Sequence, residues 1–208
     1  MLSAAEALAR LRDGNRRVVQ GVHDHNTTGR RLTLSQTQEP FAIILGCSDA
    51  RVPAELVFGQ GFGDLFVIRV AGNIVAPSQV GSVEFAAERF GTRLVVVLGH
   101  TDCGAIIATV EELRRPTRDQ SPGLRAIVDR IRPAVEPLLS ASDDARSETL
   151  VAHAVRANIR AAADHLRQGS HVLERLVQRD GLAIVGAEYC LQTGVVDFFE
   201  RVPGEAAR

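Results

Sequence analysis

Four short apolar runs limit the folds open to this chain more than any other feature of its sequence. They are rich in valine, isoleucine and leucine, and they do not alternate with polar residues. The runs are 41–45, 65–68, 94–98 and 182–186. Strands of this kind have both faces covered, so the pattern favours a parallel sheet with other structure packed against each side.

Segments with helical spacing of apolar residues lie before and between these runs. They cover 4–20, 79–89, 104–113, 123–139, 147–167 and 172–179. Within 123–139, Pro133 and Pro137 predict a break or bend, because proline removes a backbone donor and clashes with the preceding turn. The alternation of strand and helix predicts an α/β fold with a mostly parallel sheet of four to five strands, 195–199 being the candidate fifth strand at an edge.

The length and composition suit a single domain. The chain has 208 residues, of which 45% are hydrophobic and 24% charged, as in ordinary globular proteins. No repeat, low-complexity tract or linker marks a boundary. We therefore expect one domain over 1–208, with an N-terminal helical arm at 1–38, irregular from 23 onward, and the α/β core at 39–200.

The charge and the cysteines restrict the partners and the compartment. A net charge of −1 gives no electrostatic reason to expect nucleic acid or an anionic membrane as a partner. The first residues lack the apolar core of a signal peptide, and no run is long enough to span a bilayer. We expect a cytoplasmic protein whose three cysteines stay reduced.

Two of the apolar runs end in residues that suit metal binding. Cys47 follows the first run, and His100 and Cys103 follow the third. If these runs are neighbouring parallel strands, about 4.8 Å apart, the three side chains come within reach of one another. One imidazole and two thiolates suit Zn²⁺, and three protein ligands leave the open position of a catalytic site. The alternative is three unrelated turn residues, while Cys190 is interpreted as a small buried hydrophobe.

Asp49 and Arg51 lie beside Cys47 in the same turn. An arginine can hold a carboxylate in a two-pronged pair and keep it ionised, so that it can accept a hydrogen bond from a metal-bound hydroxide. The alternative is a salt bridge that only stabilises the turn.

Two motifs identify the family that this chain resembles. Residues 47–55, Cys-Ser-Asp-Ala-Arg-Val-Pro-Ala-Glu, resemble the first signature of the β-class carbonic anhydrases, and residues 100–105, His-Thr-Asp-Cys-Gly-Ala, resemble the second. Further family-like segments are 63–73, 81–85, 155–158 and 186–189. The resemblance runs from about residue 41 to 199.

This resemblance implies a twisted, mainly parallel sheet with helices on both faces. It also implies one Zn²⁺ per chain on Cys47, His100 and Cys103, with Asp49 paired to Arg51. The activity it implies is the reversible hydration of carbon dioxide to bicarbonate and a proton, by attack of zinc-bound hydroxide on CO₂. Family members form homodimers through swapped N-terminal helices, and some form homotetramers.

The resemblance also implies a narrow apolar substrate pocket that is completed across the dimer interface. By position, Phe66, Ala71 and Phe85 line this pocket, Gly104 lies near the substrate oxygen, and Gln38 matches a glutamine that many members place there.

Two branches of the family differ in whether the aspartate can move onto the zinc. The closing branch uses a tryptophan three residues before the first cysteine, where this chain has Ile44. In that branch the tryptophan belongs to a noncatalytic site for bicarbonate. Arg69 and Tyr189 match other residues of that site, but without the tryptophan the site is incomplete. We therefore expect the open branch. Hydrolysis of carbonyl sulfide or carbon disulfide, and a catalytically silent role, remain alternatives.

Overall fold

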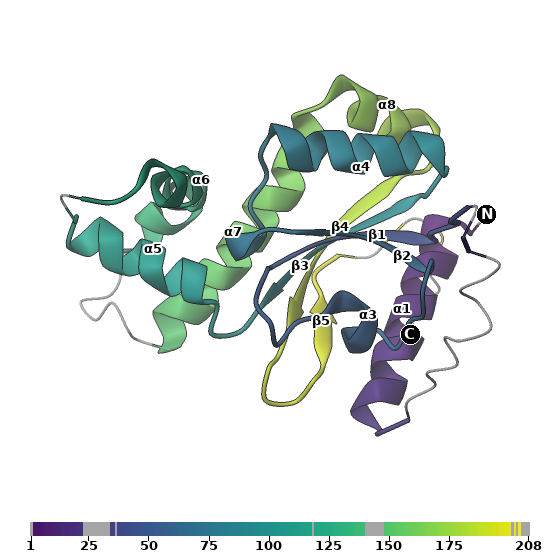
Figure 1. Ribbon diagram of the computed structural model, residues 1–208, viewed down its shortest axis with the longest axis horizontal. Helices are drawn as coiled ribbons and strands as arrows, with labels where there is room; N and C mark the ends of the chain where they lie inside the picture. The colour runs from purple at the N-terminus through teal and green to yellow at the C-terminus, as the bar shows by residue number, and fades with distance from the viewer. Residues whose placement is uncertain are drawn as a thin grey trace.

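The computed structural model describes residues 2–22, 34–35, 37–117, 119–139, 148–200, 202 and 204. In this part of the chain five strands form one sheet in the order β2-β1-β3-β4-β5 (Figure 1). The strands are β1 (Ala42–Gly46), β2 (Leu65–Arg69), β3 (Leu94–His100), β4 (Ala183–Tyr189) and β5 (Val196–Phe198). The first four are parallel, and β5 runs antiparallel to β4 at the edge. The predicted α/β fold and its edge strand are confirmed.

Helices cover both faces of this sheet. They are α1 (Ala4–Val19), α3 (Ala54–Val57), the 3₁₀ turn η1 (Ala71–Asn73), α4 (Pro77–Arg89), α5 (Gly104–Arg114), α6 (Pro122–Leu139), α7 (Glu148–Gln168) and α8 (His171–Arg179). Figure 1 shows α4 and α8 on one side of the sheet and α1 and α3 on the other. The sequence pattern did not predict the short α3 and η1.

The strands bury both faces because successive side chains point to opposite sides. Ile43 and Leu45 belong to a core cluster shared with α4, α6 and α7, whereas Ile44 belongs to a second cluster shared with α1 and α3. All of β1 is buried. This is the physical reason for the unalternating apolar runs in the sequence.

Of the break or bend predicted within 123–139, the break is absent. Helix α6 continues through Pro133 and Pro137 to Leu139. The two prolines remove two backbone donors from the helix. The helix persists because its other backbone bonds remain and because Val128, Ile131 and Val135 are buried in the core.

Helix α1 packs within its own chain. The Ser3 side chain and Glu6 form a capping box at its start, and the buried Leu8 and Leu11 share a cluster with Phe58. The apolar side of this helix therefore has its packing partner within the same chain. Residues 23–33 and 36 of the predicted arm lie outside the described part of the chain.

Among the residues that the structure describes, no helix combines the length and apolar character that crossing a membrane requires.

Candidate metal site

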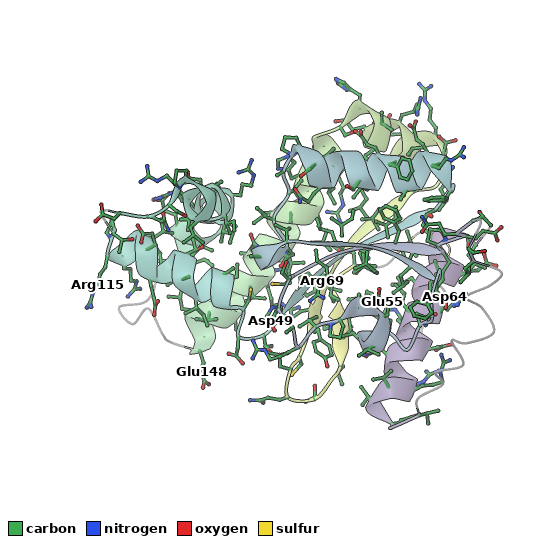
Figure 2. The ribbon with its side chains drawn as sticks, in the orientation of Figure 1. Asp49, Glu55, Asp64, Arg69, Arg115 and Glu148 are labelled. Carbon is green, nitrogen blue, oxygen red and sulfur yellow. The ribbon has the colours of Figure 1, made fainter. Side chains whose placement is uncertain are left out.

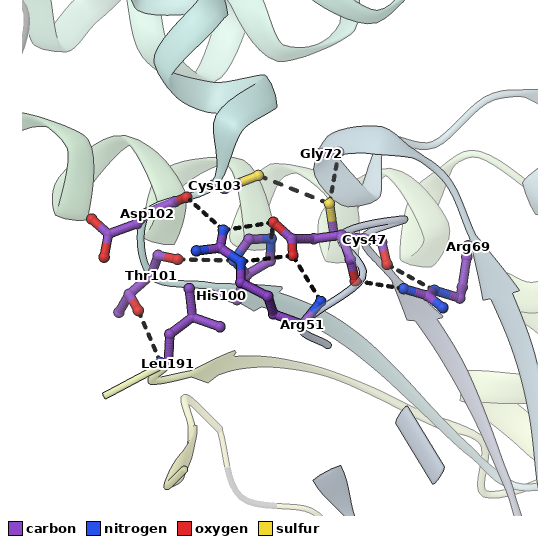
Figure 3. Close-up of polar contacts among 10 residues, drawn as sticks. Cys47, Arg51, Arg69, Gly72, His100, Thr101, Asp102, Cys103 and Leu191 are labelled. Atoms are coloured by element: carbon purple, nitrogen blue, oxygen red, sulfur yellow. Dashed lines mark hydrogen bonds and ion pairs between the residues drawn. The ribbon is translucent and has the colours of Figure 1, made fainter. Parts of the chain in front are cut away.

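The parallel pairing of β1 with β3 builds the site. Gly46 is level with Leu98, so the carboxyl ends of the two strands lie side by side. Cys47 follows β1, His100 ends β3, and Cys103 precedes α5. The three ligand atoms lie within 4.8 Å of one another and all three residues are buried (Figure 3). The structure therefore brings together the three side chains that the sequence singled out.

The His100 ring is oriented by the chain that follows it. Its Nδ1 donates to the Thr101 carbonyl at 2.8 Å, which leaves the lone pair on Nε2. Thr101 is itself held, because its amide donates to the Tyr189 carbonyl and its hydroxyl accepts from the Leu191 amide. Nε2 is buried without a hydrogen-bond partner. A buried acceptor with no donor is what a metal ligand looks like when no ion is present.

The two sulfur atoms fit the same ion. Cys47 Sγ and Cys103 Sγ are 4.0 Å apart, and two thiolates on a tetrahedral Zn²⁺, each about 2.3 Å from it, would be separated by about 3.8 Å. A hydrogen bond from the Cys103 thiol is the main reason that the pKa of Cys47 lies below its ordinary value. The donor set and its geometry therefore suit zinc.

The turn from His100 to Cys103 has an unusual backbone conformation. Asp102 has a φ of +54°, which places it in the left-handed region that asparagine and aspartate tolerate better than other side chains. This turn directs the chain from β3 back across the strand end, so that Cys103 faces the same point as His100.

Asp49 stands beside the three candidate ligands and is held by Arg51. Arg51 Nε donates to Asp49 Oδ1 at 2.9 Å and Nη2 donates to Oδ2 at 2.7 Å, and the Arg51 amide also donates to Oδ1. These bonds keep the pKa of the carboxyl well below its usual range. Oδ2 lies 3.7 Å from His100 Nε2. An ionised acceptor is thus placed next to the ligand group.

Two further elements brace the loop that carries Cys47. Arg69, at the end of β2, donates to the carbonyls of Cys47 and Asp49 at 3.0 and 2.6 Å. Figure 2 shows Asp49 and Arg69 close together near the centre of the molecule. On the other side, the Gly72 amide donates to Cys47 Sγ at 3.4 Å (Figure 3).

The structure divides the predicted pocket residues into two groups. Gly104 directly follows Cys103 in the chain, and Ala71 begins η1 next to Gly72, whose amide contacts Cys47 Sγ. Phe66 and Phe85 instead pack together, with ring centroids 6.3 Å apart, and Phe85 is 53% exposed.

Gln38 lies at the opposite end of β1 from Cys47. It is exposed and precedes the strand, whereas Cys47 follows it. Within one chain, Gln38 is therefore separated from the ligand group by the length of the strand. Cys190 is outside the metal-ligand group found among the described residues.

Sequence reasoning missed the residues that act through the backbone. It did not assign a role in the site to Gly72 or Thr101, and it matched Arg69 only to a bicarbonate site. A signal for the first was available, because the pair Gly72-Asn73 is a composition typical of a turn with positive φ. The other two contacts depend on which strands are neighbours.

A buried Cys-His-Cys group at the carboxyl edge of a parallel sheet, with an ionised carboxylate beside it, defines a metal-dependent enzyme of the α/β class. The family model described as carbonic anhydrase matches residues 42–196. That span includes all three candidate ligands.

Individual relatives agree with this match. A carbonic anhydrase from Mycolicibacterium smegmatis is 36% identical to this chain, covering 90% of it and 89% of the relative. Carbonic anhydrase 2 of Mycobacterium tuberculosis is also 36% identical, with 88% and 87% covered. The crystal structure of the β-carbonic anhydrase CafA of Aspergillus fumigatus matches with a TM-score of 0.73 at 25% identity, covering 94% of this chain and 89% of that one.

The chain belongs to the β-class carbonic anhydrases, the enzymes that hydrate carbon dioxide reversibly to bicarbonate and a proton.

Proposed function

We propose that this chain hydrates CO₂ at a single zinc site made by Cys47, His100 and Cys103. The observation that carries the proposal is the convergence of three buried ligand atoms within 4.8 Å, one of them an imidazole nitrogen with no hydrogen-bond partner. Three ligands from the protein leave one coordination position for a small molecule. When bound, Zn²⁺ supplies a Lewis acid that lowers the pKa of water and so provides a nucleophile near neutral pH.

In this proposal Asp49 and Arg51 orient what enters the site. The carboxylate can accept a hydrogen bond from a bound hydroxide or water through Oδ2. This oxygen lies 3.7 Å from His100 Nε2. Arg51 restrains the carboxylate through two parallel bonds and keeps it ionised. Because both oxygens are engaged, Asp49 is held as an acceptor and not as a fourth ligand. Ile44, in the place of the tryptophan of the closing branch, supports the same open arrangement.

Metal analysis of ligand variants tests the site. We expect about one zinc per chain in the wild-type protein, and loss of zinc and of CO₂ hydration in Cys47→Ser and Cys103→Ser. Cys190→Ser is the matched control, since Cys190 lies outside the ligand group. It should keep both metal and activity. Full zinc retention in both ligand variants would contradict the assignment.

We also propose that the working unit is at least a homodimer. One support is the Phe85 side chain, which is 53% exposed although its ring contacts Phe66 and Phe90. Gln38 and Phe85 match pocket residues, yet both are exposed, and Gln38 lies at the opposite end of β1 from the ligand group. A second copy could bring them there. Light scattering that finds an active monomer at micromolar concentration would count against this proposal.

A cytoplasmic location is also part of this proposal. Its support is that Cys47, Cys103 and Cys190 are all free thiols, which suits a reducing compartment. Fractionation of the native cells, followed by detection of the protein in the cytosolic fraction, tests it.

A further inference from the structure

A buried asparagine links α7 to the turn η1 next to the ligand group. Asn158 is only 3% exposed, and its side-chain Nδ2 donates to the Gly72 carbonyl at 2.8 Å. The two residues are 86 positions apart in the sequence. Buried amide groups are costly unless they are hydrogen-bonded, so this contact ties the turn to the helix.

The turn that Asn158 holds has an uncommon backbone conformation. Gly72 has φ +67° and ψ 20°, and Asn73 follows with φ +43°. Two consecutive residues in the left-handed region are rarely stable without support from their surroundings. The Asn158 bond to the Gly72 carbonyl fixes the plane of the peptide group between Gly72 and Asn73.

The other end of Gly72 reaches the metal ligand. Its amide donates to Cys47 Sγ at 3.4 Å, in a buried environment. The Asn158 side chain, the Gly72 residue and the Cys47 sulfur thus form one continuous chain of contacts. The direction of the Gly72 N–H depends on the φ and ψ of Gly72, which the Asn158 contact stabilises.

We propose that Asn158 is a positioning residue for the metal centre, which aims the Gly72 amide at the sulfur of Cys47. This inference rests on the proposed role of Cys47 as a zinc ligand. An N–H donor at a thiolate draws electron density from the sulfur, and partners of this kind orient metal ligands and tune the metal. The Asn158 side chain donates to the Gly72 carbonyl, so its effect on Cys47 passes through Gly72.

Removal of the Asn158 side-chain amide should disturb the turn at Gly72 and weaken metal binding. In Asn158→Leu, a side chain of similar size cannot donate, and the Gly72 carbonyl is left buried without that donor. The turn then relaxes and the N–H moves off the sulfur. The thiolate becomes more electron-rich and less well oriented. We expect metal affinity to fall by about 10- to 100-fold, the range found for outer partners of metal ligands.

A matched control exists in the same chain. Asn15 is also a buried asparagine, 5% exposed, whose Nδ2 donates to the carbonyls of Val57 and Gly194. It lies in the core on the α1 side of the sheet. Asn15 Oδ1 also accepts from the Val196 amide, so Asn15→Leu makes the same substitution, at a stability cost at least as large, without touching η1.

The experiment compares the wild-type protein, Asn158→Leu and Asn15→Leu. Zinc affinity is measured by competition with a chromophoric chelator, and the thiolate-to-metal charge-transfer band is recorded after exchange of zinc for Co²⁺. We expect Asn158→Leu to bind zinc more weakly and to shift the cobalt band to lower energy, while Asn15→Leu matches the wild type in both. A purely structural role for Asn158 would lower stability in both variants but leave the band in place.

The outcomes separate this inference from the zinc assignment. If the wild-type protein binds no zinc, the proposed site fails. If the wild type binds zinc and a folded Asn158→Leu shows the same affinity and band, the positioning role is refuted. Should Asn158→Leu not fold by circular dichroism, Asn158→Ser is measured in the same way. That shorter side chain cannot reach the carbonyl in the same geometry, so an unchanged affinity and band would again overturn the inference.

Discussion

Replacement of Gly72 by alanine tests the packing that surrounds the site. A Cβ at this position would lie 2.9 Å from Ile131 Cδ1 on α6 and 3.2 Å from Ala105 Cβ on α5. The φ of +67° is also unfavourable for any residue with a Cβ. Gly72→Ala therefore combines backbone strain with a steric conflict between η1 and the two helices that cover it.

The expected loss of stability follows from these two terms. The left-handed backbone costs about 1–2 kcal/mol for an alanine, and overpacking of a tight site costs about 1–3 kcal/mol. Gly72→Ala should therefore lower the free energy of unfolding by about 2–5 kcal/mol, a large share of the ~5–15 kcal/mol of a typical domain. Ile131→Val removes the Cδ1 atom in question and should cost about 0.5–1.5 kcal/mol alone.

The two changes should not be additive. In the double variant the Ile131 Cδ1 conflict is absent, so we expect a favourable coupling of about 0.5–3 kcal/mol between the two sites. Denaturant unfolding gives these free energies, at one protein concentration and with saturating zinc throughout, because oligomerisation and metal binding both shift apparent stability.

Gly181→Ala isolates the backbone term. Gly181 has φ +70°, and a Cβ there would meet nothing within 4 Å. It should cost only the conformational part, about 1–2 kcal/mol. If Gly72→Ala is no more destabilising than Gly181→Ala, or if Ile131→Val gives no relief, the reasoning about the packing of η1 is wrong.

Three further predictions concern the site, the surface and helix α1. Arg51→Ala releases the Asp49 carboxylate and should lower CO₂ hydration by about 10- to 100-fold in stopped-flow assays, so wild-type activity would contradict the role of the pair. Phe85→Ser should shift the mass measured by light scattering toward the monomer, and an unchanged mass would place the interface elsewhere. Ser3→Ala removes the cap of α1 and should cost about 0.5–2 kcal/mol in denaturant unfolding, an effect that Glu6→Gln, which keeps the Ser3 hydroxyl, should show only in part.

Much of the fold could be predicted because burial on both faces leaves a direct record in the sequence. The run at 94–98 has no polar residue, since alternate side chains of β3 enter two different core clusters. The helix predicted at 123–139 is present as α6, and it is not broken at Pro133 or Pro137. There the burial of one face of α6 outweighs the local preference of proline against a helix interior.

The ligand group was predictable for a chemical reason. One imidazole and two thiolates form a donor set that suits Zn²⁺, and a parallel sheet collects its strand ends at one edge. Asp49 and Arg51 are two residues apart, so their pairing needs only the local turn. These residue identities are determined by the sequence whatever the order of the strands.

The tertiary structure alone decided which distant groups meet. The adjacency of β1 and β3 brings Cys47 to His100, the position of α7 brings Asn158 to Gly72, and the buried residues of α1 pack against their own chain. Each of these contacts joins residues far apart in the sequence, and each depends on strand order and helix placement. Those are set by the packing of the whole core, because no single segment carries enough buried surface to choose its neighbours.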